Sequence, residues 1–220
     1  MIGEKRIVLL CGHYGSGKTN VAVNLAMHLK GRYAQVTLAD LDIVNPYFRS
    51  NDSRADLEQA GVRLICSAYA NTNVDIPALP QELYAITDDL SHRAVLDIGG
   101  DDRGALVLGR IAQAILKEND YEMLLVINRY RPLTRDAAST LEVMREIEVA
   151  GRIRFTGLVN NSNLGEETTA EDVLASLPYA EEVSSLTGLP VVMTAVSERL
   201  YAELFERIPH PFSLSLQKKF

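Results

Sequence analysis

The sequence is poor in cysteine and has no long hydrophobic run. Its 220 residues include only 2 cysteines, Cys11 and Cys66, which are far apart and form no C-x-x-C pair, so we expect both to be small core residues rather than metal ligands. No apolar stretch approaches the roughly 18 residues that suggest a membrane helix, and the N-terminus lacks the long apolar core of a secretory signal. A cytoplasmic protein without a membrane anchor is therefore expected.

Positive charge is also scarce. Lys and Arg together number 22 against 29 Asp and Glu, which gives a net charge of −7 at pH 7. This balance argues against nucleic acid as the main partner. The chain is 47% hydrophobic and shows no internal repeat, low-complexity segment or linker, so we expect residues 1–220 to form a single domain around one sizeable core.

The clearest motif lies near the N-terminus, between a strand pattern and a helix pattern. Residues 12–19 read GHYGSGKT and fit G-x-x-x-x-G-K-[ST], the phosphate-binding P-loop. The apolar run before it predicts a buried strand, and apolar residues at helical spacing after it predict a helix. Glycines let backbone N–H groups turn toward phosphate oxygens at a helix N-terminus. The motif therefore predicts a P-loop nucleotide-binding domain, with nucleotide contacts from Gly12, His13, Tyr14, Gly15, Ser16, Gly17, Lys18, Thr19 and Asn20.

Strand-like and helix-like segments alternate along the chain. Several strand-like runs are almost entirely apolar, as in parallel sheets that are covered on both faces. The alternation predicts an α/β fold, a doubly wound, mainly parallel, seven-stranded sheet with helices on both faces. Strands are predicted near residues 5–11, 35–40, 62–66, 94–98, 122–128, 155–160 and 190–196. Helices are predicted near residues 18–30, 53–60, 80–90, 104–118, 133–150, 169–187 and 197–207.

Ligands of such sheets gather at the carboxyl ends of the strands. Asp40 and Asp42 follow the second predicted strand, and they point to opposite sides if that strand continues. Asp97 ends the fourth, apolar strand, where a carboxylate of a Mg²⁺-nucleotide site belongs. The glycines that follow it, including Gly100, supply a loop that can move with the state of the terminal phosphate.

Together these motifs resemble the MinD/ParA/CobQ-type P-loop ATPases, relatives of the nitrogenase iron protein, over roughly residues 5–197. In that group the loop usually reads K-G-G-x-G-K-[ST], and its first lysine reaches across a dimer to the partner's nucleotide. Here His13 stands in place of the lysine and Tyr14 follows it. His13, mostly neutral at pH 7, could substitute in part or be an exposed loop residue. A homodimer is possible, but we do not expect it to depend on ATP.

The resemblance implies roles for the matching residues, with ATP and Mg²⁺ as cofactors. Lys18 is the catalytic phosphate lysine. Asp42 matches the catalytic aspartate that orients or deprotonates the attacking water. Gly100 matches the glycine whose N–H meets the γ-phosphate. The implied metal-site residues are Thr19, Asp42 and Asp97, the last often acting through water.

The segment GLVNNS at residues 157–162 resembles the iron-protein segment that carries an adenine-contacting asparagine, which places that role on Asn161. An amide suits the role because its donor and acceptor match the N6/N7 edge of adenine. Asn160 or Asn161 could instead cap the next turn. Asn128, after the fifth strand, is expected to shape a loop.

Three uses of the nucleotide are compatible with the sequence. The first is a slow ATPase that acts as a nucleotide-driven switch on a partner protein or metallocentre, which the patterned segment of residues 42–49 supports. The second is a carboxylate-activating enzyme of the dethiobiotin synthetase type, and the third is a small-molecule or nucleotide kinase. The arginines available to a basic pocket are Arg49, Arg103, Arg129 and Arg131. Arg103 is the preferred assistant in phosphoryl transfer because it follows the Asp97 loop.

The C-terminal tail carries two prolines, Pro209 and Pro211, that oppose a helix start. Phe212, Leu214 and Leu216 alternate at the period of a strand. We therefore expect the tail to pack on the body of the protein rather than to anchor it in a membrane.

Overall fold

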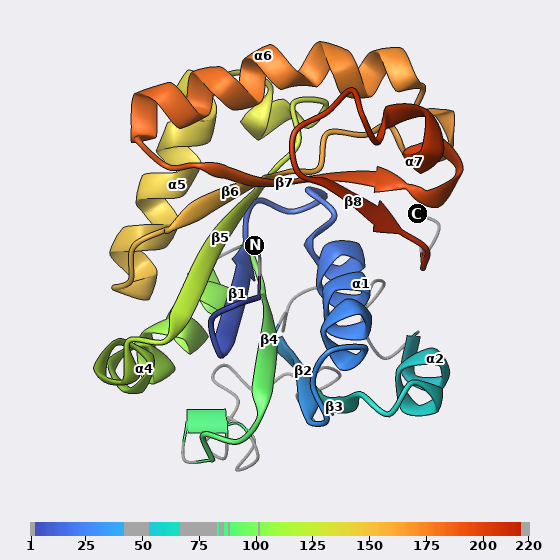
Figure 1. The fold of residues 1–220 in the computed structure, drawn as a ribbon. Coiled ribbons are helices and arrows are strands. Elements are labelled where there is room, and N and C mark those ends of the chain that lie inside the picture. Colours follow the sequence, from blue (N-terminus) through green and yellow to red (C-terminus); the bar gives the residue numbers. More distant parts are fainter. Residues whose placement is uncertain are drawn as a thin grey trace.

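The computed structural model describes residues 3–41, 53–66, 83, 86–87, 89–100 and 102–216. Its strands are β1 (Ile7–Cys11), β2 (Val36–Leu41), β3 (Arg63–Cys66), β4 (Arg93–Ile98), β5 (Tyr121–Ile127), β6 (Gly157–Asn160), β7 (Val191–Ser197) and β8 (Pro211–Leu214). They form one sheet in the order β3-β2-β4-β1-β5-β6-β7-β8, and each described pair is parallel (Figure 1). This arrangement is the parallel α/β sheet of a P-loop NTPase, and it places β1 between β4 and β5.

The predicted count of seven strands is wrong, because β8 adds an eighth beside β7. The alternation of Phe212 and Leu214 indicated a strand, but the tail was not counted as part of the sheet. Pro211 is compatible with this place because proline, which lacks an N–H, is tolerated at the first residue of an edge strand. Beyond the strand, the side-chain oxygen of Asn24 accepts from the backbone N–H groups of Ser215 and Leu216, which fixes the tail on α1.

Helices cover both faces of the sheet. They are α1 (Lys18–Lys30), α2 (Arg54–Gln59), α4 (Asp102–Glu118), α5 (Ala137–Gly151), α6 (Ala170–Thr187) and α7 (Glu198–Leu204), with short 3-10 turns η2 (Pro132–Thr134) and η3 (Gly165–Glu167). Helices α4, α5 and α6 pack on one face, and α1 and α2 pack on the other (Figure 1). The predicted helix near 80–90 lies mostly outside the described residues, although 83, 86 and 87 are helical.

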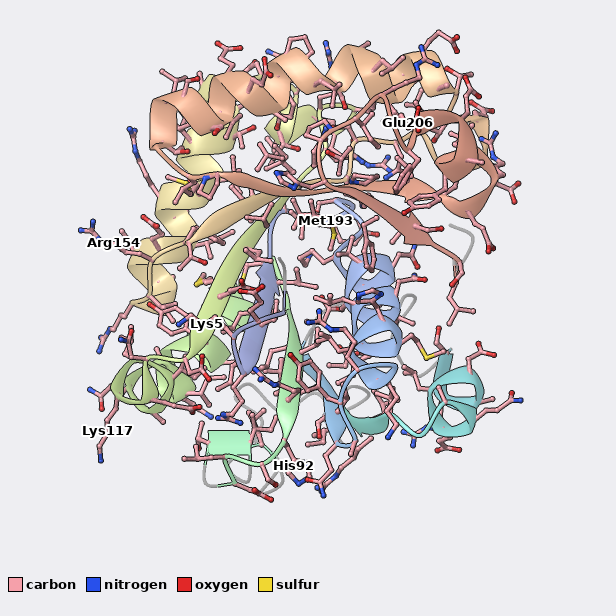
Figure 2. The ribbon with its side chains drawn as sticks, in the orientation of Figure 1. Lys5, His92, Lys117, Arg154, Met193 and Glu206 are labelled. Carbon is pink, nitrogen blue, oxygen red and sulfur yellow. The ribbon has the colours of Figure 1, made fainter. Side chains whose placement is uncertain are left out.

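The core consists of two apolar layers because the strands alternate between faces. Along β1, Ile7 and Leu9 contribute to the α4–α5–α6 layer, whereas Val8 and Leu10 contribute to the layer under α1. Met193 of β7 is buried in the α1 layer, while Lys117 points outward (Figure 2). No helix in the described part of the chain is both long and apolar enough to cross a bilayer. Helices thus cover both faces of the sheet, so a ligand site is expected at the carboxyl ends of the strands.

Candidate functional site

The predicted P-loop connects the central strand β1 to α1. Gly12, Gly15 and Gly17 all have positive φ, of 150°, 76° and 83°. Space also requires glycine at the two ends of the loop, because a Cβ on Gly12 would lie 2.4 Å from the Val126 carbonyl oxygen and one on Gly17 would lie 2.3 Å from Nδ2 of Asn161. Backbone conformations of this kind direct successive N–H groups into a concave anion site.

Lys18, the first residue of α1, has only 5% of its surface exposed. Its Nζ donates to the carbonyl oxygen of His13 within the same loop, at 3.4 Å. The Oγ of Ser16 is buried and has no hydrogen-bond partner in the described part of the structure.

Burial raises the pKa of the neighbouring Cys11 thiol and keeps it protonated, although the Lys18 charge opposes the shift. The predicted core role of Cys11 is confirmed, since its side chain is fully buried.

Thr19 and Asp97 meet at the side of the P-loop that faces β4. The Thr19 hydroxyl donates to Oδ2 of Asp97 at 2.6 Å, and Asp97 is fully buried. Asp40 lies inside β2, directly beside Asp97 in the strand register, and is also buried. A hydroxyl and a carboxylate are oxygen ligands of the kind that Mg²⁺ prefers, and Mg²⁺ commonly uses one or two protein ligands beside water and phosphate oxygens.

The loop after β4 touches the P-loop through its backbone. A Cβ on Gly100 would lie 2.1 Å from the carbonyl oxygen of Gly12 and 3.1 Å from the carbonyl carbon of His13. Because so short a contact is possible only for glycine, the segment that follows Asp97 packs directly on the loop that Lys18 closes. A displacement of one of these loops toward the other would therefore bring their backbone atoms into collision.

Asn161 follows β6 and lies on the opposite side of the P-loop. Its Nδ2 donates to the carbonyl oxygen of Ser16 at 2.7 Å. A carbonyl can only accept a hydrogen bond, so this contact identifies which end of the amide is the nitrogen. The amide oxygen is buried and makes no hydrogen bond to the described residues. The other predicted asparagine, Asn160, instead donates from its Nδ2 to Ser176.

The loops that follow β5 and β6 are joined by Asn128. Its Oδ1 accepts from the backbone N–H of Tyr130 at 3.0 Å and from that of Asn163 at 3.3 Å. The Thr134 hydroxyl donates to the Asn128 carbonyl oxygen at 2.7 Å. Asn128 is fully buried and shapes these loops, as the sequence predicted.

The remaining predicted residues are distributed unevenly around the site. Tyr14 is 60% exposed, and Nδ1 of His13 lies 3.0 Å from the Tyr14 carbonyl oxygen. Asp42 and Arg49 lie outside the described residues, as does the side chain of Arg103. Asn20 lies in the first turn of α1, half-buried.

Arg129 and Arg131 are both predicted to be available to a basic pocket, but their surroundings differ. The Arg129 guanidinium donates to the Ala175 carbonyl oxygen on α6. The Arg131 Nε donates to the Gly15 carbonyl oxygen at 2.8 Å, inside the P-loop. The 116 positions between Arg131 and Gly15 explain why no local pattern in the sequence indicated this contact.

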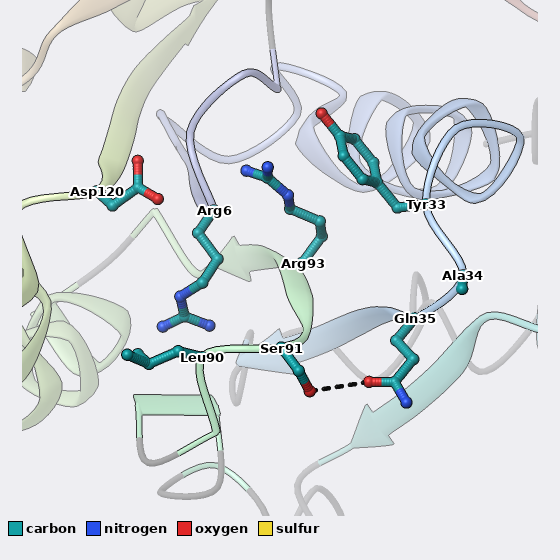
Figure 3. A pocket seen from close by; sticks show the side chains of 8 residues that line it. All are labelled: Arg6, Tyr33, Ala34, Gln35, Leu90, Ser91, Arg93 and Asp120. Carbon is teal, nitrogen blue, oxygen red and sulfur yellow. Dashed lines mark hydrogen bonds between the residues drawn. The ribbon is translucent and has the colours of Figure 1, made fainter.

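A pocket of about 490 Å³ lies at the other end of the sheet, where β1, β2 and β4 begin (Figure 3). Arg6, at its floor, binds Glu118 with two guanidinium nitrogens and donates to the His92 carbonyl oxygen. Arg93 stacks on the Tyr33 ring with 4.3 Å between the guanidinium carbon and the ring centroid. These cations are engaged in contacts that hold the strand starts together, and the pocket is separate from the P-loop.

Solved structures share the fold at low identity. The signal recognition particle receptor FtsY from Elizabethkingia anophelis superposes with a TM-score of 0.53 at 18% identity, covering 87% of this chain and 58% of that one. FtsY from Mycoplasma mycoides gives 0.52 at 18%, covering 87% and 60%. FlhF complexed with GTP/Mg²⁺ gives 0.50 at 15%, covering 86% and 64%. The chain therefore spans less than two thirds of each of these proteins.

Comparison with curated proteins gave no match. The family model described as the CobQ/CobB/MinD/ParA nucleotide binding domain, CbiA, matches residues 7–191. That range runs from the first residue of β1 to the first of β7 and includes the P-loop, Asp97, Gly100 and Asn161. The chain thus contains a nucleotide-binding P-loop NTPase domain and belongs to the CobQ/CobB/MinD/ParA family.

Proposed function

We propose that this protein binds ATP with Mg²⁺ and hydrolyses it slowly, as a switch that a partner protein or a metallocentre reads. The observation that carries the proposal is the packing of Gly100 on the P-loop. A loop in contact with the phosphate site changes position when the content of that site changes, and this is how nucleotide switches work.

The residues present fit a Mg²⁺-nucleotide. The Thr19 hydroxyl and the Asp97 carboxylate, 2.6 Å apart, supply the hard oxygen donors, and Lys18 and the P-loop N–H groups would hold the phosphates. The bound Mg²⁺ neutralises charge that develops on the phosphate oxygens during transfer. Asp42 would orient or deprotonate the attacking water, as the family resemblance implies.

Asn161 supports ATP as the nucleotide. With one N–H committed to Ser16, the amide keeps a second N–H and a buried oxygen. A donor beside an acceptor complements the adenine edge, which offers an acceptor ring nitrogen beside the N6 amino group. The structural neighbour FlhF was solved with GTP/Mg²⁺, so GTP is the alternative that binding experiments must compare.

Hydrolysis assays of Asp42→Ala test the switch proposal. We expect the variant to retain ATP binding while its hydrolysis rate falls at least ~100-fold, the scale of losing a general base. Unchanged hydrolysis would remove Asp42 from the mechanism and make Asp40, which lies beside Asp97, the next candidate.

A carboxylate-activating enzyme is the second candidate function. It is favoured by Arg131, whose guanidinium lies against the P-loop, where an acidic substrate would approach the phosphates. ATP hydrolysis measured with and without a panel of carboxylic acids separates the two functions. A rate that one acid stimulates, with a phosphorylated or condensed product, favours the enzyme, whereas a rate that no acid changes favours the switch.

The absence of the trans-acting lysine leads us to propose an oligomeric state that does not depend on ATP. A ligand shifts an equilibrium only by its differential affinity for the two states, and His13 supplies little positive charge at pH 7. Sedimentation with ADP and with a non-hydrolysable ATP analogue should give the same species. His13→Lys should promote a dimer with the analogue if the family's geometry is otherwise kept.

A further inference from the structure

Arg131 makes a contact that the proposed nucleotide switch does not use. Its Nε lies 2.8 Å from the Gly15 carbonyl oxygen. Its side chain also runs close to the loop, because a Cβ on Gly15 would lie 3.5 Å from Nε and 3.6 Å from Cδ of Arg131. The arginine is half-buried, and its two terminal nitrogens make no hydrogen bond or ion pair with the described residues.

The contact fixes the orientation of a peptide unit. In a trans peptide the C=O and the following N–H point in opposite directions, and the described chain has no cis bond. Holding the Gly15 oxygen on Arg131 therefore fixes the opposite direction of the Ser16 N–H, which donates within the loop to the His13 carbonyl oxygen at 3.1 Å. Asn161 does the same for the next peptide unit, because it holds the Ser16 oxygen and so fixes the opposite direction of the Gly17 N–H.

Arg131 is itself held rigidly. Its backbone N–H donates to the Asn128 carbonyl oxygen at 3.1 Å, and its carbonyl oxygen accepts from Thr134 at 3.1 Å. Pro132 follows and fixes the backbone at the start of η2. A side chain on so constrained a turn can define the position of a flexible glycine loop. Because the backbone of Arg131 is already ordered, forming the contact costs little further conformational entropy.

We propose that Arg131 is a positioning residue that preorganises the P-loop for phosphate binding through the Gly15 carbonyl. This inference rests on nucleotide binding at the site described above. Arg131 follows β5, whereas Asp97 lies near the end of β4 and Gly100 follows that strand, on the other side of β1. Arg131 therefore supports the phosphate chain from the side away from Thr19 and Asp97. Its contribution to nucleotide affinity is equal for a diphosphate and a triphosphate.

Two substitutions separate the Nε hydrogen bond from the positive charge. Arg131→Gln places an N–H donor the same number of bonds from Cα as the arginine Nε but removes the charge. Arg131→Met has a similar apolar stem but neither donor nor charge. We expect Arg131→Met to weaken the affinity for ADP and for a non-hydrolysable ATP analogue by the same factor of about three to ten, the worth of one hydrogen bond. Arg131→Gln should bind both nucleotides within about twofold of the parent.

The measurements are titration calorimetry for both nucleotides and steady-state hydrolysis. For Arg131→Met we expect KM to rise with kcat unchanged, the pattern of lost uniform binding. The nucleotide-free melting temperature should stay within about 4 °C of the parent, which excludes general unfolding. Arg135→Met, on the same turn and paired only with Asp136 among the described residues, removes an equal charge and serves as the control.

Three results would overturn the inference. Parent-like nucleotide binding by Arg131→Met would show that the contact contributes nothing to affinity. Equal losses of affinity in Arg131→Gln and Arg131→Met would show that the charge matters rather than the donor. A loss of kcat alone would make Arg131 a catalytic group. If the parent protein binds no nucleotide at all, the proposed function fails instead.

Discussion

The Thr19 hydroxyl donates to Asp97 Oδ2 over 2.6 Å and so joins the first turn of α1 to the end of β4, across 78 positions of sequence. The alternation of side chains between the two faces of β4 explains why Asp97 lies beside Thr19. Val95 packs in the layer under α1, and Asp97, two residues on, points to the same face. The strand thus delivers a fully buried carboxylate to the helix start, where the P-loop ends.

The first prediction concerns this pair. Asp97→Asn should raise the Mg²⁺ concentration needed for half-maximal nucleotide binding by at least about tenfold, the scale of losing a group around a metal site. The neutral amide keeps the volume of the carboxylate but not its charge. Nucleotide binding titrated against Mg²⁺ measures the effect.

Thr19 provides the matched variants for that experiment. Thr19→Ser keeps the hydroxyl and should behave like the parent, whereas Thr19→Val should follow Asp97→Asn. An Asp97→Asn protein with the parent's Mg²⁺ dependence would show that the pair is a structural hydrogen bond only.

The second prediction concerns Lys18. At 100 times its Kd, Mg-ATP should stabilise the parent by about 2.7 kcal/mol. For a chain of this size the melting temperature should rise by roughly 5–10 °C. Lys18→Ala should lose most of that shift, because the buried ammonium is the main positive charge in the loop. Thermal unfolding with ATP, ADP, GTP and GDP is the measurement, and no shift with any of the four would contradict the nucleotide site itself.

The third prediction concerns Asn161 and the choice of base. Asn161→Asp replaces the N–H that Ser16 accepts with an oxygen, so two acceptors would face each other across 2.7 Å. We expect affinity for both ATP and GTP to fall by about tenfold, because a buried acceptor is left unpaired. The preference for ATP should also shrink. The exposed Asn119→Asp adds the same charge far from the site and is the control; tighter binding of GTP than ATP by the parent would refute the adenine role.

Much of the site could be predicted because its signals are local. The P-loop, the strand before it and the helix after it lie within one continuous segment, and the apolar run that ends at Asp97 identified the carboxylate of β4. The position of β8 could not be predicted in the same way. Four residues of alternating pattern do not reveal whether they pair with β7 or only pack on it.

The contacts of Arg131 and Asn161 show a second limit. Both side chains hold carbonyl oxygens of the P-loop, Gly15 and Ser16, and a backbone acceptor leaves no trace in the sequence. The resemblance to the iron-protein segment predicts that Asn161 contacts the adenine base, but it does not indicate the hydrogen bond of Asn161 to the loop. Asp40 was placed after a strand that in fact extends to Leu41, because propensity defines strand ends poorly.

The fourth prediction concerns the pH dependence of stability. The Thr169 hydroxyl and its backbone N–H both donate to the Asp172 carboxylate in the capping box of α6, and they hold the Asp172 pKa below its ordinary 3.8. The folded state thus favours the ionised form, and this contribution is present above the ordinary value and is lost as pH falls through the folded pKa. Asp172→Asn should destabilise the protein at pH 7, and the difference should shrink between about pH 5 and pH 2. Urea unfolding at several pH values tests this; a constant difference would contradict it.

The last prediction concerns the contact between Gly100 and the P-loop. A methyl group on Gly100 would lie 2.1 Å from the Gly12 carbonyl oxygen, which is backbone and cannot rotate away. Gly100→Ala must therefore move the loop after β4 or the P-loop, and we expect nucleotide affinity to fall by at least about tenfold, since overpacking costs about 1–3 kcal/mol. Gly109→Ala, whose new methyl group would lie 3.4 Å from the Ala150 carbonyl oxygen, should bind like the parent. If Gly100→Ala also binds and hydrolyses nucleotide like the parent, the two loops move independently and the switch loses its structural basis.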